Sequence, residues 1–262
     1  MTVRELRRDR VPDERDLPPE LTFVFIHHAG GSASAYLPFV RHLPGRWRVI
    51  GLELPARFPF VKQAACRSMT EAVDWMMNAV WAEVSGPFAV FGHSMGALVA
   101  YELVRELEER GRPPVWLGLS ASAAPHLAAG HRRHHWPHER LLRFMRHLGG
   151  TPDELWRQPH VLERMTHCLR NDLAIVDTYE HRGGPPLSTP MSVYSGAADP
   201  VIGDALMQPW IDHASEVISH RTWPGGHFYL FDQVDEVCAR IVEDVHSVMS
   251  REPAMSWEPA AA

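Results

Sequence analysis

Three residues of this 262-residue chain have the types and the chain order of a nucleophile, an acid and a base. Ser94 lies at the centre of GHSMG, residues 92–96, which is a G-x-S-x-G pattern. Asp199 and His227 follow it, each in a short glycine-containing loop. A serine hydroxyl becomes an effective nucleophile when a histidine accepts its proton and a carboxylate orients that histidine. The pattern therefore indicates acyl transfer through a covalent serine intermediate.

The residues around Ser94 predict a strand, a sharp turn and a helix. Residues 88–91 are aromatic or apolar and indicate a buried strand, and residues 97–109 have a helical pattern. This context is what a nucleophile elbow requires, with glycines where a side chain would collide with a neighbouring element. The alternative is a glycine-rich turn without chemistry, and the two flanks favour the catalytic interpretation.

The acid and the base are expected on loops that follow late strands. Asp199 comes directly after a predicted strand at 190–194, and His227 comes directly after one at 216–222. The alternatives are a turn aspartate that caps the next segment and a histidine of a surface loop. Asp204 is a second candidate for the acid, but it lies further from the strand and is typical of a helix N-cap.

Two backbone amides are the predicted oxyanion donors. One is the N–H of Met95, the residue after the nucleophile, because the helix that begins there directs its amides at a developing negative charge. The second is the N–H of Ala29, in the loop that follows the predicted strand at residues 21–26. The glycines of that loop, HHAGGSAS at 27–34, let its backbone approach a ligand closely.

Histidine is frequent in this chain, and one cluster has a helical spacing. His131, His134, His135 and His138 fall at i, i+3, i+4 and i+7, which on one helix could hold a metal. Pro137 interrupts that helix, so a solvated basic surface with Arg132 and Arg133 is the preferred interpretation, and no metal is predicted. Of two further histidines, His93 is expected to orient the elbow and His28 to make a local hydrogen bond.

Strands alternate with helices along the chain, which predicts an α/β fold with a mostly parallel sheet and right-handed crossovers. The predicted strands are residues 21–26, 47–54, 88–91, 115–120, 190–194 and 216–222, and the predicted helices are residues 36–43, 69–84, 97–109, 204–213 and 234–249.

The alternation stops after Pro125. Residues 126–184 contain no convincing strand and carry two apolar helical stripes, so they are expected to form a helical lid over the catalytic edge of the sheet. The domain prediction is an extended lead-in at 1–20, one α/β domain at 21–251 that includes the lid, and a flexible tail at 252–262.

Composition excludes several classes of function. A hydrophobic fraction of 45% is typical of a globular protein with an ample core. A net charge of −6 gives no indication of a nucleic-acid-binding surface. No apolar run is long enough to span a membrane, and the first residues do not resemble a signal peptide. Cys66, Cys168 and Cys238 are widely spaced and odd in number, which favours reduced thiols. A cytoplasmic monomer without membrane or nucleic-acid partners is therefore expected.

With these motifs in place, residues 21–249 resemble the type II thioesterases of polyketide synthase and non-ribosomal peptide synthetase systems. The motifs that carry the resemblance occur in the family's order. They are HAGGSA at 28–33, FGHSMGA at 91–97, LGGTP at 148–152, LRND at 169–172 with Tyr179, GAAD at 196–199 and GGHF at 225–228.

The resemblance implies an α/β-hydrolase fold with a helical lid, catalytic Ser94, Asp199 and His227, and oxyanion donors at Ala29 and Met95. It also implies hydrolysis of acyl groups from the phosphopantetheine arm of acyl or peptidyl carrier proteins, which removes stalled or misprimed intermediates. That arm belongs to the substrate, so no cofactor is expected. The sequence departs from the family at four positions near the pocket mouth, which leaves the triad untouched and the substrate range open: His27, Ala56, Ser122 and Ala123.

Substrate and partner contacts are expected on the lid. Five apolar side chains are the predicted chamber, with packing of the lid's own core as the alternative: Trp136, Phe144, Met145, Trp156 and Met165. Four arginines are the predicted docking surface for an acidic carrier protein: Arg132, Arg133, Arg140 and Arg143. A transacylase or cyclase, a carboxylesterase of small esters and a non-catalytic megasynthase-binding partner are the rival functions.

Overall fold

The computed structural model describes residues 3–6, 18–57, 60–128 and 131–251. Within them, strands pair in the order β1-β3-β2-β4-β5-β6-β7, all in parallel except for β1, which runs antiparallel to β3. The strands are β1 Val3–Glu5, β2 Leu21–Ile26, β3 Trp47–Leu52, β4 Phe88–His93, β5 Trp116–Ser120, β6 Met191–Gly196 and β7 Val217–Trp223. The predicted mostly parallel α/β sheet is confirmed.

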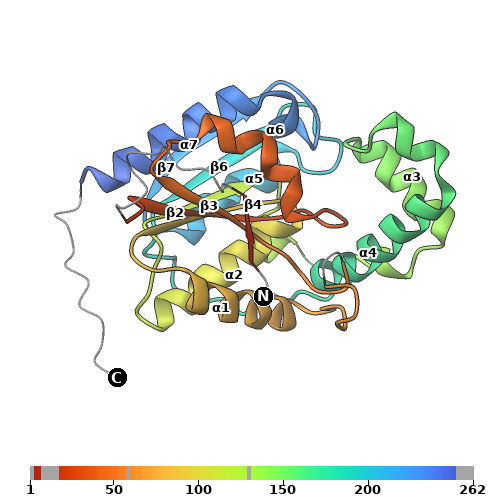
Figure 1. The fold of residues 1–262 in the computed structure, drawn as a ribbon, viewed down its shortest axis with the longest axis horizontal. Helices are drawn as coiled ribbons and strands as arrows, with labels where there is room; N and C mark the ends of the chain where they lie inside the picture. The colour runs from red at the N-terminus through yellow and green to blue at the C-terminus, as the bar shows by residue number, and fades with distance from the viewer. Residues whose placement is uncertain (1–2, 7–17, 58–59, 129–130, 252–262) are drawn as a thin grey trace.

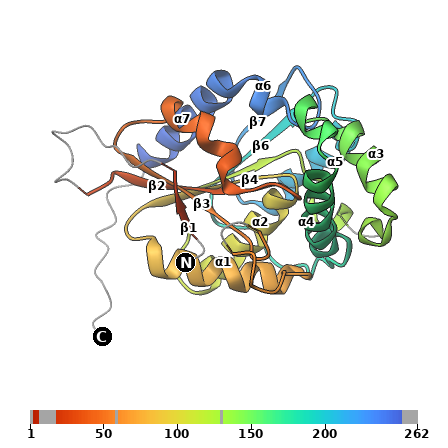
Figure 2. The ribbon, with the colours of Figure 1, turned by 45° about the vertical axis from the view of Figure 1, so that its right-hand side comes forward.

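Helices cover both faces of this sheet (Figures 1 and 2). The α-helices are α1 Met69–Glu83, α2 Met95–Glu109, α3 His138–Leu148, α4 Pro159–Asp177, α5 Asp204–Met207, α6 Tyr229–Asp232 and α7 Val234–Met249. The 3-10 helices are η2 Ala33–His42, η3 Pro125–Leu127, η4 Arg133–His135, η5 Asp153–Arg157 and η6 Gln208–His213.

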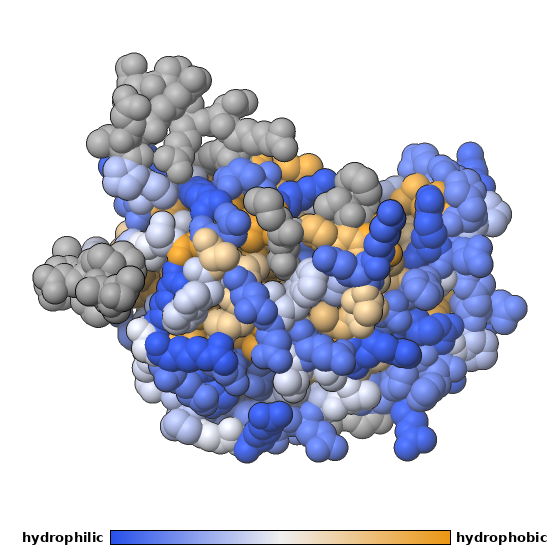
Figure 3. All heavy atoms as spheres, turned by 60° about the horizontal axis from the view of Figure 1, so that its bottom comes forward, coloured by the Kyte–Doolittle hydropathy of each residue, from blue (hydrophilic) through white to orange (hydrophobic). Residues whose placement is uncertain are grey.

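The sheet separates two hydrophobic cores. Apolar side chains of α1 and α2 pack on one face, and those of η2 and α7 pack on the other. All six residues of β2 are buried, because helices cover both of its faces, and a strand in that position reads as a continuous apolar run. The face shown in Figure 3, which includes the lower side of the molecule in Figure 1, is mostly hydrophilic. The helices there are therefore amphipathic, with their apolar sides turned to the sheet.

The predicted helical segment 126–184 contains α3, α4, η4 and η5, and its described residues include no strand. In Figures 1 and 2, α3 and α4 lie to one side of the sheet. The Asp172 side chain of α4 accepts a hydrogen bond from Gly30, which follows the end of β2. The segment thus reaches the carboxyl edge of the sheet, where ligands of α/β folds bind.

Three predictions differ from the structure. Residues 3–5, expected in an extended lead-in, are a strand paired with β3. Residues 36–43 were expected to form a short helix, and the helix found, Ala33–His42, begins three residues earlier and is a 3-10 helix with Pro38 inside it. The expected helix 204–213 is a single α-helical turn followed by η6, whose Pro209 lacks the amide N–H that would continue the α-helix. The predicted tail at 252–262 lies outside the described residues.

Among the described residues, no helix combines the length and the apolar character needed to cross a membrane.

One residue of the loop after β3 has a strained backbone. Ala56 has a φ of 61°, in the left-handed region that glycine adopts without a steric cost. This is one of the four positions where the sequence departs from the resembled family.

Ala56→Gly is therefore expected to raise the free energy of unfolding by up to about 1 kcal/mol, because the steric cost outweighs the added entropy of the unfolded chain. Urea denaturation would measure it. Ala239 is exposed in the middle of α7 and serves as the control, since Ala239→Gly should lower the same quantity by about 0.5–1 kcal/mol. Equal destabilisation by both substitutions would contradict the explanation.

Candidate active site

Ser94 sits in a sharp turn between β4 and α2. Its φ of 58° and ψ of −121° are strained for a residue with a side chain, and such strain is concentrated at functional sites. A Cβ at Gly92 would collide with the Gly96 carbonyl, and a Cβ at Gly96 would collide with the end of β2 at Ile26. Only glycine therefore fits on either side of Ser94, and the predicted strand, turn and helix are confirmed.

The structure brings the predicted nucleophile, base and acid into one hydrogen-bonded chain. The Ser94 hydroxyl lies 2.9 Å from Nε2 of His227, and Nδ1 of His227 lies 2.7 Å from Oδ2 of Asp199. With the imidazole proton on Nδ1, His227 donates to Asp199 and its Nε2 accepts from Ser94. This is the geometry that lets an imidazole take a proton from a hydroxyl.

Asp199 is held as an ionised group. Its Oδ1 accepts hydrogen bonds from the amides of Val201 at 2.9 Å and Ile202 at 3.0 Å, while Oδ2 faces His227. Burial raises the pKa of this carboxyl, but the hydrogen bonds from His227 and the two amides outweigh burial and lower the pKa below its usual value. A carboxylate results that fixes the tautomer and the orientation of the imidazole.

The register of the sheet aligns the two predicted oxyanion donors. Ile26 of β2 pairs with Gly92 of β4, and Ala29 and Met95 each lie three residues beyond these positions. Met95 is the first residue of α2, so its amide N–H has no partner within the helix. The Ala29 amide has no acceptor among the described residues. Both N–H groups are thus available to a ligand at this edge of the sheet.

Two more histidines lie close to His227. Nδ1 of His93 lies 2.9 Å from the Ser120 hydroxyl, which in turn lies 2.8 Å from the Tyr229 hydroxyl. Burial lowers the pKa of His93 well below its ordinary value, so this ring stays neutral. The main-chain N–H of Ser94 also donates to the Ser120 carbonyl at 2.7 Å. His93 therefore ties the elbow to the end of β5, in keeping with the predicted orienting role.

His28 differs from its prediction. Burial lowers its pKa to about 3, and its Nδ1 is buried without a hydrogen-bond partner among the described residues. The ring instead packs edge-on against Phe228, with the ring centroids 4.9 Å apart. The expected hydrogen bond of this side chain is absent from the described residues, because the ring lies in an aromatic cluster.

The four spaced histidines do not share a helix face. His134 belongs to η4 and contacts Asp177 at 2.9 Å, whereas His138 begins α3 and contacts Thr166 at 3.0 Å. The chain breaks between the two helices at Pro137, as the sequence predicts.

Two cavities adjoin the oxyanion loop, here defined as residues 29–31. One, of about 80 Å³, is lined by apolar side chains that include Met145, Met165 and Phe228. The other, of about 1530 Å³, opens between the loop, Arg57 and α4. Both are also lined by His28 and Gly30, so they meet at the loop.

Two of the five predicted chamber residues line these two cavities. Met145 and Met165 line the small cavity, but Trp136, Phe144 and Trp156 line neither cavity. These three aromatic side chains pack on the core of the helical segment, with Leu141 at its centre. This packing agrees with the core alternative. The sequence could not distinguish the two roles, because a cavity wall and a core have the same apolar periodicity.

The chain carrying this site matches a known family model. A family model for the thioesterase domain matches residues 22–245. The chain belongs to the thioesterase family. Two similar proteins support the assignment. The linear gramicidin dehydrogenase LgrE of Brevibacillus parabrevis is 31% identical over 235 residues, 88% of this chain and 89% of that protein. The thioesterase PikA5 of Streptomyces venezuelae is 33% identical over 232 residues, 87% of this chain and 81% of that protein.

A solved structure also resembles this thioesterase. The type II thioesterase BorB of the borrelidin biosynthetic cluster superimposes with a TM-score of 0.83 and 29% identity, over 93% of this chain and 97% of that one. The predicted resemblance to type II thioesterases and the predicted α/β-hydrolase fold are therefore confirmed.

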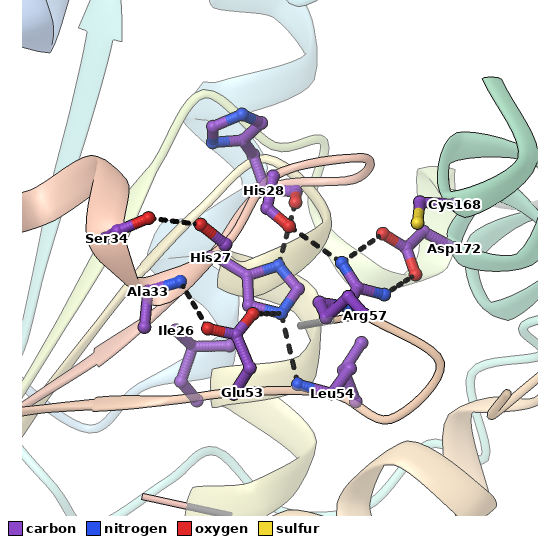
Figure 4. Close-up of polar contacts among 12 residues, drawn as sticks. Ile26, His27, His28, Ala33, Ser34, Glu53, Leu54, Arg57, Cys168 and Asp172 are labelled. Atoms are coloured by element: carbon purple, nitrogen blue, oxygen red, sulfur yellow. Dashed lines mark hydrogen bonds and ion pairs between the residues drawn. The ribbon is translucent and has the colours of Figure 1, made fainter. Parts of the chain in front are cut away.

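The thioesterase also contains a buried acid that its sequence did not predict. Glu53 is 1% exposed, accepts a hydrogen bond from the Ala33 amide at 3.0 Å, and lies 3.7 Å from Nε2 of His27. That imidazole connects two strand ends, since its Nδ1 donates to the His28 carbonyl and its Nε2 accepts from the Leu54 amide (Figure 4). Burial raises the pKa of Glu53 to about 7.

This pKa makes stability depend on pH. Between pH 4.5, the ordinary value for a glutamate, and pH 7, the folded protein keeps a proton that the unfolded chain has released, so stability falls as pH rises. Glu53→Gln removes the titration and retains an acceptor for Ala33. The variant is expected to be more stable than the wild type by on the order of 1–3 kcal/mol at about pH 8 and equally stable near about pH 5. Denaturation at both pH values tests this. A difference that is equal at both would assign the effect to packing.

Proposed function

We propose that this protein is a serine thioesterase that hydrolyses acyl groups from the phosphopantetheine arm of acyl or peptidyl carrier proteins. The hydrogen-bonded chain from Ser94 through His227 to Asp199 carries the proposal, because a thioesterase-family chain with this geometry has an activated nucleophile. The pathway comes from the relatives, since BorB is described as a type II thioesterase of a biosynthetic cluster. The role is then to clear stalled or misprimed acyl groups from a polyketide or non-ribosomal peptide assembly line in the cytoplasm.

In the first half of the reaction, Oγ of Ser94 attacks the carbonyl carbon of the thioester while its proton passes to Nε2 of His227. The amides of Ala29 and Met95 hold the oxyanion of the tetrahedral intermediate. The C–S bond then breaks, and the departing sulfur takes the proton from His227. Asp199 stabilises the imidazolium that forms in between.

In the second half, His227 takes a proton from water as the water oxygen attacks the acyl-serine ester. Collapse of the second tetrahedral intermediate returns the proton to Oγ of Ser94 and releases the free acid. Every group in this cycle is a side chain, a backbone amide or water, so the proposal includes no metal or cofactor.

The name of LgrE raises the question of redox chemistry. A dehydrogenase that binds a dinucleotide through a Rossmann fold would carry a G-x-G-x-x-G loop after a strand. The loop after β2 reads HHAGGSAS at 27–34 and lacks that pattern, and the spacing occurs nowhere else in the chain. Hydrolysis by the serine is therefore the function that these residues favour.

Carrier docking is the finer part of the proposal. Of the four predicted arginines, Arg133 pairs with buried Asp177 at 2.8 Å and is not available to a partner. Arg132, Arg140 and Arg143 are exposed, and Arg140 also lies over the Trp136 ring, 4.0 Å from its centroid. We propose that these three side chains contact an acidic carrier protein.

Hydrolysis of acyl groups loaded on a phosphopantetheinylated carrier protein tests the reaction. The wild type should release the free acid, whereas Ser94→Ala should lose activity by a factor on the order of 10⁴ or more, because no other hydroxyl can form the acyl-enzyme. A product other than the acid would indicate a transacylase or cyclase, and faster turnover of oxoesters would indicate a carboxylesterase. Carrier binding without any release, together with a Ser94 that does not react with a fluorophosphonate, would support the non-catalytic partner.

Reversing charge at Arg140 and Arg143 tests docking. The double Glu variant should raise KM for the carrier-bound substrate about 3- to 30-fold, since exposed pairs contribute about 0.2–1 kcal/mol each, and should leave small soluble thioesters unaffected. Arg46→Glu is the control, because Arg46 is exposed and precedes β3, at the opposite edge of the sheet from the site. Equal effects on carrier-bound and small substrates would contradict the docking surface.

A further inference from the structure

The oxyanion loop is bound by a side chain of the helical segment. Oδ2 of Asp172, in α4, accepts a hydrogen bond from the Gly30 amide at 2.7 Å. Asp172 is 1% exposed, and 142 positions separate the two residues in the chain. The contact therefore joins the loop after β2 to the helical segment. Gly30 directly follows Ala29, whose amide is a proposed oxyanion donor.

Arg57 holds the other side of the same loop. Its Nη1 donates to the Gly31 carbonyl at 2.8 Å and to Oδ2 of Asp172 at 3.0 Å, and its Nη2 donates to Oδ1 of the same carboxylate (Figure 4). Arg57 is 8% exposed as a residue, so its pairing with Asp172 is formed largely out of water. Asp172 and Arg57 together fix a donor and an acceptor of consecutive residues in the loop.

Packing allows little other movement of the loop. Gly30 has a φ of 74°, and a Cβ there would lie 3.3 Å from Cβ of Leu169, one helical turn before Asp172. Ala29 itself packs against the hydrophobic cluster that α3 and α4 form around Leu141. The backbone that carries the proposed donor therefore lies directly on α4.

Stability does not explain the pair well. Taking a carboxylate and a guanidinium out of water costs several kcal/mol per ion, and well-packed apolar residues often replace such pairs without loss. The rigid, bidentate pairing of Arg57 with Asp172 is instead suited to fixing the position of the loop backbone. Oxyanion donors must be placed to within a fraction of an ångström.

We propose that Asp172 and Arg57 are positioning residues that set the Ala29 amide in the oxyanion hole, so that the hole is complete only while α4 is seated on the loop. This inference rests on the proposed function of Ala29. The helical segment then acts on the reaction itself as well as on access: displacement of α4 takes Asp172 away and releases the Gly30 amide. A substrate that holds α4 against the loop therefore also keeps the oxyanion hole complete for its own hydrolysis.

The test compares two aspartates of α4. Asp172→Asn removes the charge that joins Arg57 to Gly30, and it should lower kcat for a small soluble thioester about 10- to 100-fold with KM changed less than about threefold, since removal of one donor costs about 10²–10³. Asp177→Asn is the matched control, because Asp177 is also buried in α4 and pairs with Arg133 and His134, away from the loop. The control should keep kcat within about threefold of the wild type.

A second readout separates positioning from folding. A fluorophosphonate places a phosphoryl oxygen in the oxyanion hole when it reacts with Ser94, so its second-order rate constant should fall in Asp172→Asn by the same factor as kcat. Thermal denaturation should show both variants folded. Arg57→Met should lower both rates as well, and the double variant should be little slower than the slower single variant, because both residues act through one loop.

Two results would overturn the inference. One is a loss of stability in Asp172→Asn with kcat and the phosphonylation rate unchanged, which would make the pair merely structural. The other is a loss of kcat with an unchanged phosphonylation rate, which would place the effect outside the oxyanion hole. Failure of the proposed function looks different: the wild type would then release no acid. If that wild type still reacts with the fluorophosphonate, the variants test the positioning by that rate, and if it does not, both proposals fail.

Discussion

The close approach of α2 to the ends of β2 and β4 is the constraint on which the site depends. Because Gly92 and Gly96 carry no side chains, the helix begins directly after Ser94 and its free amides face the carboxyl edge of the sheet. The same approach holds Ser94 at a positive φ, a cost that the surrounding strands must offset. Those strands do so with long apolar runs, and the two cores that flank the sheet are the largest among the described residues.

The sequence was sufficient for the parts of the fold that depend on local pattern. β2 was predicted with its observed bounds, because six successive apolar or β-branched residues between polar segments are typical of a buried strand. Ser94, Asp199 and His227 were predicted to lie together because each follows a strand in a parallel sheet, and parallel strands end at one edge. Long-range geometry then brought Asp199 and His227 within hydrogen-bonding distance, in agreement with the order of the motifs.

The remainder was not accessible from sequence for physical reasons. The pairing of Val3–Glu5 with β3 depends on a partner more than 40 positions away, and three residues carry no periodicity of their own. Arg57 lies in a loop and Asp172 lies on a helix, 115 positions further along the chain. A charged residue in either place is expected to be solvated, and the sequence does not reveal its burial. Trp136 and Phe144 are large apolar residues, which occur both in cavity walls and in hydrophobic cores, so their type does not tell the two roles apart. Glu53 gave a weak signal, since an acid inside the apolar run predicted as a strand at 47–54 is a candidate for burial.

The N-terminal strand has a practical consequence. β1 covers the outer edge of β3, which would otherwise present a row of unpaired amides and carbonyls to any extended peptide. Shortening the chain past residue 6 would therefore uncover a template for strand addition between molecules, at the side of the sheet remote from β7. An expression variant of this protein should accordingly keep its first residues and carry any affinity tag after Arg251, the residue that follows the end of α7 by two positions.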